Sequence, residues 1–271
     1  MDIFIEMIQF PFMQRAFIAG ALLGLLLSTL GVIATLRKMS FFGEGIAHAS
    51  LAGIAIALLA GFAPLPVAIV WAVLIATGIF LLERYTKLPS DSLIGIFFTG
   101  SMALGVVLMQ FTGGYQPELI SFLFGSILTV TQMDLYIIGA LTVAILTWFI
   151  ASRRQLVFLA LSPDSAQVSG VAVHRQLFIF YIALAIATVL GVKLLGIVLI
   201  SALIILPAAT SSLLSHSFKS YLILAVIVSE VTILLGLTLS YFFDLPSGAS
   251  IVILGTLLFF LSLITQRFVQ K

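Results

Sequence analysis

The sequence contains no cysteine, which excludes disulfides, thiolate nucleophiles and thiolate metal sites. A transition-metal site in this chain would have to use histidine, carboxylate, methionine or backbone oxygen. Charge is also scarce: Lys, Arg, Asp and Glu make up 8% of the 271 residues, against roughly a quarter in ordinary soluble domains. The net charge of +2 is too small to indicate a nucleic-acid partner.

Apolar side chains dominate the composition, at 62% of the residues with a mean hydropathy of +1.30. A globule of this size could not hide so much apolar surface from water, so lipid must be the solvent for most of the chain. We therefore expect an all-α polytopic membrane protein in which residues 1–271 form a single transmembrane domain. The sequence has no Walker, His-Glu-x-x-His or Gly-x-Ser-x-Gly motif, so neither a nucleotide site nor a hydrolase is predicted.

Nine apolar runs are long enough to predict membrane-spanning helices. They are residues 16–36, 46–62, 65–83, 92–110, 133–151, 177–192, 195–213, 221–243 and 247–265. Eight spans are equally compatible with the sequence if 46–62, or one of the pair around Lys193, is re-entrant. Phe111 to Thr131 is expected to be an extracellular loop with a short helix.

The basic residues indicate the orientation. With alternating spans they fall on one side, which we assign to the cytoplasm, while the opposite loops 61–66, 111–132 and 244–246 contain no Lys or Arg. Only Lys193 departs from this pattern, and we expect it to extend from a span end to the membrane surface. Nine spans place the N-terminus outside and the C-terminus in the cytoplasm.

Ionisable residues inside an apolar span are expensive and are candidates for function. Glu44 and His48 are four residues apart, so a helix would place both on one face, where a carboxylate and an imidazole could hold a divalent cation together. Small residues recur beside them at every fourth position, from Gly45 to Ala57, and predict close packing against another helix. The alternative is that Glu44 caps the helix and His48 bonds a backbone carbonyl.

Two further carboxylates are weaker candidates for a metal path. Glu230 lies near the middle of a predicted span, either as a packing residue near Lys193 or as a pore carboxylate. Asp244 lies in an outside turn before the last span, where a turn and cap role competes with the collection of cations.

The segment 162–175 begins with a helix start signal, Ser162-Pro163-Asp164, and contains a helix stop, Gly170. A short helix in a cytoplasmic loop suits the docking of a separate motor protein. A plain interfacial loop explains the same residues.

Five sequence blocks, in order along nearly the whole chain, resemble the ABC-type zinc/manganese/iron permeases, and most of all their zinc branch. They are Met39-Ser-Phe-Phe-Gly-Glu-Gly-Ile-Ala-His-Ala-Ser-Leu-Ala-Gly53, Ser92-Leu-Ile-Gly-Ile-Phe-Phe, Leu123-Phe-Gly-Ser-Ile-Leu-Thr-Val, Gly196 to Thr210, and Asp244-Leu-Pro-Ser-Gly-Ala-Ser-Ile-Val252.

This resemblance implies a homodimeric permease in the bacterial cytoplasmic (inner) membrane. Its expected partners are two cytoplasmic ATPase chains and an extracytoplasmic metal-binding protein. His48 falls on the family's pore histidine, and Glu44 falls where the family usually has Asp. The transported ion is expected to be Zn²⁺ first and Mn²⁺ or Fe²⁺ second, with no permanently bound cofactor.

The resemblance also makes residues 162–172 the coupling helix that enters a groove on the ATPase. Its expected contact residues are Ser162, Pro163, Asp164, Ala166, Gly170 and Val171.

A proton-coupled secondary metal transporter that uses Glu230 is the alternative from another class. A membrane enzyme is disfavoured, because the sequence shows neither a catalytic dyad nor a substrate cleft.

Overall fold

The computed structural model describes residues 9–86, 88–111, 125, 130–197 and 200–269. These residues form α-helices and no strand, which confirms the all-α prediction. The helices are α2 (Pro11–Leu36), α3 (Phe42–Ala60), α4 (Pro64–Tyr85), α5 (Ser90–Met109), α7 (Gln132–Leu161), α8 (Pro163–Val168), α9 (Val173–Leu195), α10 (Ile200–Leu214), α11 (Phe218–Phe243) and α12 (Ser247–Val269).

Within the described residues, eight helices are long and apolar enough to cross a membrane, and α10 is a shorter apolar helix of 15 residues. Of the segments that we considered as re-entrant, α3 qualifies as a full span and the short helix is the one after Lys193. Most of the predicted loop from Phe111 to Thr131, and most of the motif that begins at Leu123, lie outside the described residues.

Two predicted boundaries differ from the structure. α3 begins at Phe42 rather than at residue 46, so Glu44 is inside the helix. α7 continues to Leu161 rather than ending at 151, because no helix-breaking residue occurs before Ser162 and Pro163. The predicted tight turn between the second and third spans is confirmed: Gly61, at φ 70°, ends α3, and Pro64 begins α4.

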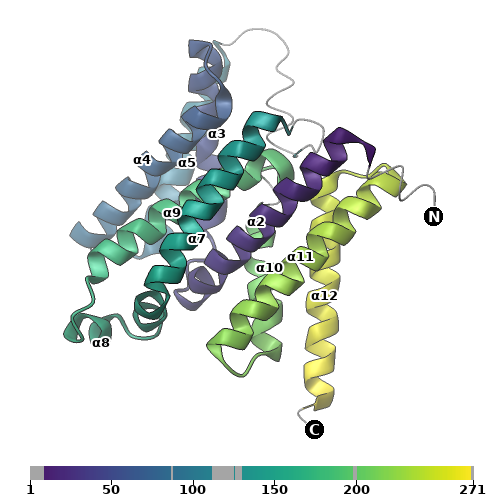
Figure 1. Cartoon of the computed structure of the whole chain (residues 1–271). Helices are drawn as coiled ribbons and strands as arrows, with labels where there is room; N and C mark the ends of the chain where they lie inside the picture. The colour runs from purple at the N-terminus through teal and green to yellow at the C-terminus, as the bar shows by residue number, and fades with distance from the viewer. Residues whose placement is uncertain (1–8, 87, 112–124, 126–129, 198–199, 270–271) are drawn as a thin grey trace.

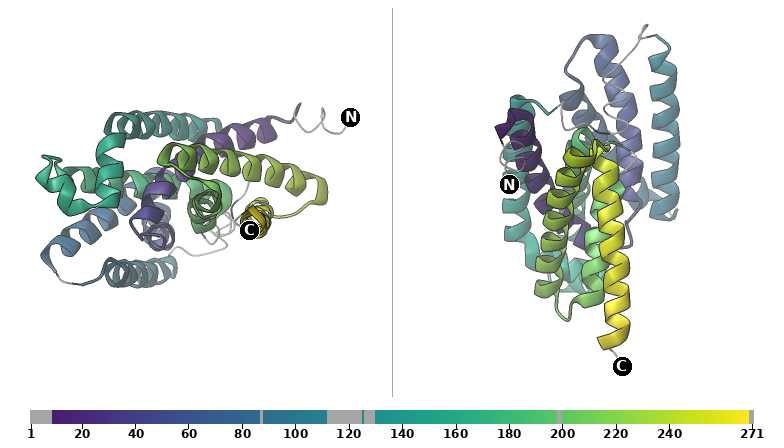
Figure 2. Two further views of the ribbon diagram at one scale, coloured as in Figure 1. Left: turned by 90° about the horizontal axis from the view of Figure 1, so that it is seen from below. Right: turned by 90° about the vertical axis from the view of Figure 1, so that its right-hand side faces the viewer.

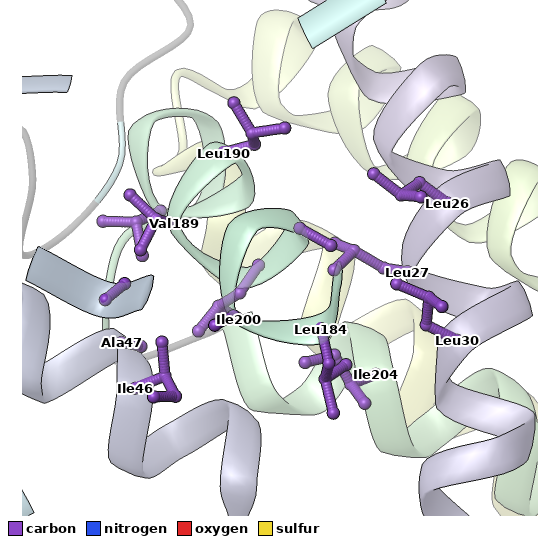
Figure 3. Packing of buried hydrophobic residues seen from close by; sticks show 14 of the residues in the cluster. Leu26, Leu27, Leu30, Ile46, Ala47, Leu184, Val189, Leu190, Ile200 and Ile204 are labelled. Atoms are coloured by element: carbon purple, nitrogen blue, oxygen red, sulfur yellow. The ribbon is translucent and has the colours of Figure 1, made fainter. Parts of the chain in front are cut away.

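The centre of the molecule is the packing of α2, α3, α9 and α10. Figure 3 shows side chains from all four helices meeting, among them Leu27 of α2, Ile46 of α3, Leu190 of α9 and Ile204 of α10, each with no more than 1% of its surface exposed. Membrane helices with this much buried surface are fixed by van der Waals packing rather than by contact with lipid.

The helices fall on two sides of the bundle. α7, α2 and α11 lie in the foreground of Figure 1, while α3, α4 and α5 lie towards the far left, and the views in Figure 2 agree. α2 begins at the upper end of the molecule in Figure 1, whereas α8 and the end of α12 lie at the lower end. The two ends of the described chain therefore lie at opposite ends of the bundle.

Candidate functional site

α3 presents Glu44 and His48 on one face, as the four-residue spacing predicts. Glu44 is exposed and His48 is partly exposed, whereas Gly45, Ala47 and Ala49 are buried. Glu44 lies in the first turn of α3, where the positive end of the helix dipole favours a carboxylate. The two side chains are close enough to interact electrostatically.

Neither side chain has a hydrogen-bond partner within the described part of the chain. Glu44 and His48 make no hydrogen bond there, so the alternative of a cap and a backbone bond is not found. The contact that orients His48 is with Phe98 of α5, whose ring centroid lies 5.1 Å from that of the imidazole. The carboxylate oxygens of Glu44 and the imidazole nitrogens of His48 are therefore available to a ligand.

The small residues on α3 allow close packing, as predicted. A Cβ atom on Gly53 would lie 2.8 Å from Trp71 Cβ and 2.9 Å from Ala68 Cα, both on α4. Polar bonds lock the same region: the Ser101 hydroxyl of α5 donates to the Ala49 carbonyl at 2.7 Å, and Trp71 Nε1 donates to Ser101 Oγ at 2.8 Å. α4 and α5 thus hold the rest of α3 firmly while the face with Glu44 and His48 stays open.

Among the described residues, no third candidate ligand joins Glu44 and His48. The described residues contain no group of three or more His, Asp or Glu side chains that could hold a metal ion. Zinc in proteins takes about four ligands in tetrahedral geometry. A complete zinc site at Glu44 and His48 would therefore need ligands beyond the described residues of one chain.

Glu230 lies apart from Glu44 and His48, at the contact between α11 and α2. Its Oε1 would lie 2.9 Å from a Cβ atom on Gly24, and the backbone of Leu25 is placed to bond the carboxylate. The expected neighbour, Lys193, is paired with a different residue, so that part of the prediction is wrong.

Lys193 forms an ion pair with Asp134 of α7, with Nζ 2.5 Å from Oδ2. The sequence did not predict this partner, which joins the last turn of α9 to the first turn of α7. The extension of Lys193 to the membrane surface stays a prediction. Asp134 also closes a capping box, in which its carboxylate accepts the backbone N–H of Thr131 at 2.8 Å. The two charged residues are 59 positions apart, so no local sequence pattern indicates the pair.

Asp244 occupies the turn between α11 and α12, as expected. It is exposed and adopts a left-handed conformation, φ 52°, as the residue that ends α11. The Ser240 hydroxyl donates to the Leu245 carbonyl at 2.6 Å across the same turn. The turn role is confirmed, and no cluster of ligands surrounds Asp244 among the described residues.

The segment after α7 forms the short helix that the sequence predicts. The backbone N–H of Ser165 donates to Ser162 Oγ at the start of α8, and Gly170 has φ 79° after its end. Ala166 is buried against the bundle, whereas Val168 is 90% exposed. α8 therefore projects an apolar side chain away from the rest of the molecule.

A polar cluster of Tyr181, Glu83 and Ser90 lies at the α8 end of the bundle, and the sequence did not predict it. The Tyr181 hydroxyl of α9 donates to the carboxylate of Glu83 on α4, and Ser90 Oγ donates to the same carboxylate at 2.7 Å. The Tyr181 ring also packs on Phe42 at the start of α3, at a centroid distance of 5.0 Å. This cluster links α4, α5 and α9, and through Phe42 it contacts the first turn of α3.

Arg37 joins this cluster to the end of α7. Its guanidinium donates to the Leu159 carbonyl at 3.5 Å, three residues before Ser162. Burial lowers the pKa of Arg37 from its ordinary value, while the nearby Tyr181 and Glu83 oppose that shift. Arginine remains charged at neutral pH even so.

An all-α fold in which eight of the described helices are long and apolar enough to cross a membrane is that of a multi-pass membrane protein. The chain belongs to the ABC 3 transport family, whose profile matches residues 9–266. The assignment to metal-ion permeases of ABC transporters, which the sequence blocks suggested, is thereby confirmed.

Individual relatives match over nearly the whole chain. The high-affinity zinc uptake system membrane protein ZnuB of Haemophilus influenzae is 33% identical over 259 residues, which cover 96% of this chain and 99% of that protein. The manganese transport system membrane protein MntC of Halalkalibacterium halodurans is 32% identical, over 96% of this chain and 89% of that protein. The solved structure of PsaBC from Streptococcus pneumoniae in complex with Fab superposes with a TM-score of 0.85 at 31% identity, covering 96% and 94%.

Proposed function

We propose that this permease carries zinc across the bacterial cytoplasmic membrane, driven by a separate ATPase. The observation that carries the proposal is the outward-facing pair Glu44 and His48, whose ligand atoms make no hydrogen bond within the described residues. A carboxylate and a neutral imidazole are both ligands for zinc.

A second copy of the chain completes the site in this proposal. Two protomers that face each other across α3 would contribute two carboxylates and two imidazoles, which is the number of ligands that tetrahedral zinc takes. Support comes from the incomplete ligand set of one chain and from the open face of α3. The longer side chain of Glu44, compared with the Asp usual in the family, would change the reach of the carboxylate by one methylene.

Manganese and iron are the alternatives to zinc. The relatives named for zinc and for manganese are similarly distant, at 33% and 32% identity. Ligand chemistry favours zinc over manganese. At a nitrogen-containing site the affinity for divalent metals rises from Mn²⁺ through Fe²⁺ to Cu²⁺, and the affinity for Zn²⁺ is higher than that for Mn²⁺.

The ATPase is proposed to dock on α8, with one ATPase chain for each permease chain. Ser162, Pro163, Asp164, Ala166, Gly170 and Val171 would form or shape this contact. The α8 end and the C-terminus then lie in the cytoplasm, in line with the basic residues at that side. An extracytoplasmic metal-binding protein would deliver the ion at the opposite end.

Competitive uptake of zinc and manganese tests the proposal. Cells that lack their own importers would express this chain with its candidate ATPase, either intact or with the Walker lysine replaced. We expect zinc uptake that disappears with the inactive ATPase. Uptake that persists with the inactive ATPase and collapses with the proton gradient would instead favour proton-coupled transport through Glu230. Preferred uptake of manganese would retain the ATP-driven importer and overturn the choice of zinc.

A further inference from the structure

A basic cavity lies at the α8 end of the molecule, between the end of α7 and the start of α11. Its volume is about 820 Å³, and three basic side chains line it: Arg153 and Arg154 from α7 and Lys219 from α11. All three residues are exposed. Within the described part of the chain none of them forms an ion pair, and no acidic residue lines the cavity. The cavity therefore offers three cations to an anionic ligand.

An apolar groove continues from this cavity along the side of the bundle. It has a volume of about 380 Å³ and shares Arg153 and Leu222 with the basic cavity. Apart from Arg153 and Thr29 its walls are apolar side chains of α7 and α11, such as Ile150 and Val226, and α2 forms the floor. One elongated site thus has a cationic end and an apolar length.

The dimensions of this site match one leaflet of a bilayer. On α11 the lining runs from Phe218 to Ile227, which spans about 14 Å at the rise of an α-helix. Half of the hydrocarbon thickness of a bilayer is about 15 Å. The groove starts at the end of the span, where lipid headgroups lie, and follows the helices towards the middle of the membrane.

The groove lies on a different side of the molecule from the face on which the second protomer is proposed. α7, α2 and α11 lie on one side of the molecule and α5, which contacts His48 through Phe98, lies on the other (Figure 2). A dimer formed across the face of Glu44 and His48 would leave the groove open to the bilayer.

We propose that this groove is a binding site for an anionic phospholipid. The phosphate of the headgroup binds Arg153, Arg154 and Lys219, and one acyl chain lies between α7 and α11. Basic pockets between membrane helices are suited to such headgroups, because each Lys or Arg near an anionic lipid surface strengthens binding roughly fivefold. The inference goes beyond metal transport and does not depend on it.

Bound lipid on the purified full-length chain tests this site. The protein would be delipidated in mild detergent and titrated with an equimolar mixture of phosphatidylglycerol and phosphatidylcholine, and the retained lipids would be counted by native mass spectrometry. We expect phosphatidylglycerol to exceed phosphatidylcholine by at least about tenfold. Equal retention of the two lipids would overturn the proposal.

Two sets of variants separate the headgroup from the acyl chain. Arg153→Gln/Arg154→Gln/Lys219→Gln should reduce the preference to about one, and the matched control Lys38→Gln/Arg84→Gln/Arg175→Gln, on basic residues outside the groove, should retain it. Ile150→Trp, which fills the apolar groove with all charges intact, should also release the bound phosphatidylglycerol. Unchanged retention in either the first or the last variant contradicts the site, provided that the variant elutes as folded protein.

The competing occupant is the ATPase, since α8 adjoins the cavity. The titration is therefore repeated on the complex with the ATPase chain. Lipid that stays bound in the complex supports the proposal. Displacement of the lipid by the ATPase, together with loss of the ATPase in the Arg153, Arg154 and Lys219 variant, would make the groove a protein docking surface and overturn it. Both readouts are independent of uptake, so a failed lipid site and a failed transport function are distinguishable.

Discussion

The amino group of Lys193 lies 2.5 Å from a carboxylate oxygen of Asp134, and this ion pair fastens the end of α9 to the first turn of α7. The exposed fractions of the two side chains are 18% and 7%. A charge that loses its partner in such surroundings cannot be solvated well. The same carboxylate fixes Thr131, so one side chain holds both the start of α7 and the end of α9.

Replacing Lys193 alone should therefore destabilise the protein. We expect Lys193→Met to lower the free energy of unfolding by about 3 kcal/mol, because Asp134 is left as an unpaired buried charge. Adding Asp134→Asn to Lys193→Met should recover part of this loss, since the charge is gone and an acceptor for Thr131 remains. Thermal unfolding of the purified protein in detergent measures both. Additive losses in the double variant would contradict this account.

The pair on α3 should be needed for transport and not for folding. We expect Glu44→Ala and His48→Ala each to reduce metal uptake by at least roughly tenfold, because ligand groups are lost from the path. Expression in the membrane and thermal stability should stay close to those of the unchanged protein, since neither residue makes a hydrogen bond in the described part of the chain. His174→Ala, on a histidine at the start of α9, is the matched control. Uptake by His48→Ala at the unchanged rate would remove His48 from the path.

The close approach of α3 and α4 should make Gly53 intolerant of even one methyl group. Gly53→Ala places a Cβ atom 2.9 Å from a backbone atom of Ala68, and we expect a loss of about 1–3 kcal/mol in the free energy of unfolding. Gly100→Ala on α5 is the control, because nothing lies within 4 Å of its added Cβ. That variant should be neutral or more stable by up to about 1 kcal/mol, since alanine favours helix over glycine. Equal melting temperatures for the two variants would refute the packing argument.

The hydroxyl of Tyr181 should contribute to the stability of the protein. Tyr181→Phe keeps the aromatic contact with Phe42 but removes a donor to the Glu83 carboxylate. We expect a loss of about 2 kcal/mol, as for other hydrogen bonds to charged groups. Tyr85→Phe, at a tyrosine that is 75% exposed, should leave the melting temperature unchanged. A loss of the same size in both variants would show that the Glu83 bond is not the cause.

The exposed apolar side chain on α8 should be part of the contact with the proposed ATPase. Val168→Asp places a charge where a partner would bury an apolar group, and we expect at least about tenfold less ATPase to co-purify with the permease. The fold of the permease should not change, because Val168 makes little contact with it. His216→Asp, at an exposed residue between α10 and α11, is the control. Unchanged co-purification of Val168→Asp would place the contact elsewhere.

The apolar runs predict the helices well because lipid leaves the chain few alternatives to a helix. The predicted helix boundaries are wrong where polar residues lie within a helix and lower the local hydropathy. α3 begins earlier than its apolar run, since Glu44 and the glycines beside it lower the local hydropathy, while Gly43 and Gly45 pack closely against neighbouring helices. α7 continues beyond its apolar run because Arg153, Arg154 and Gln155 are good helix formers.

The site is predictable only where its parts are close in sequence. The four-residue spacing of Glu44 and His48 is by itself enough to place both side chains on one face of α3. In contrast, Lys193 with Asp134, and Tyr181 with Glu83, meet across helices that are far apart along the chain. The same holds for the cavity between α7 and α11, where the basic residues resemble ordinary loop charges until the tertiary arrangement brings them together.

The short helix α10 differs in kind from the other apolar helices. Its 15 residues extend about 22 Å, well below the roughly 30 Å of a bilayer's hydrocarbon core. None of its residues from 200 to 211 is exposed, so neighbouring helices rather than lipid surround it. The neighbouring helices, and not the bilayer, therefore accommodate the short length of α10. A thicker or thinner membrane should change the tilt of the outer helices without moving α10.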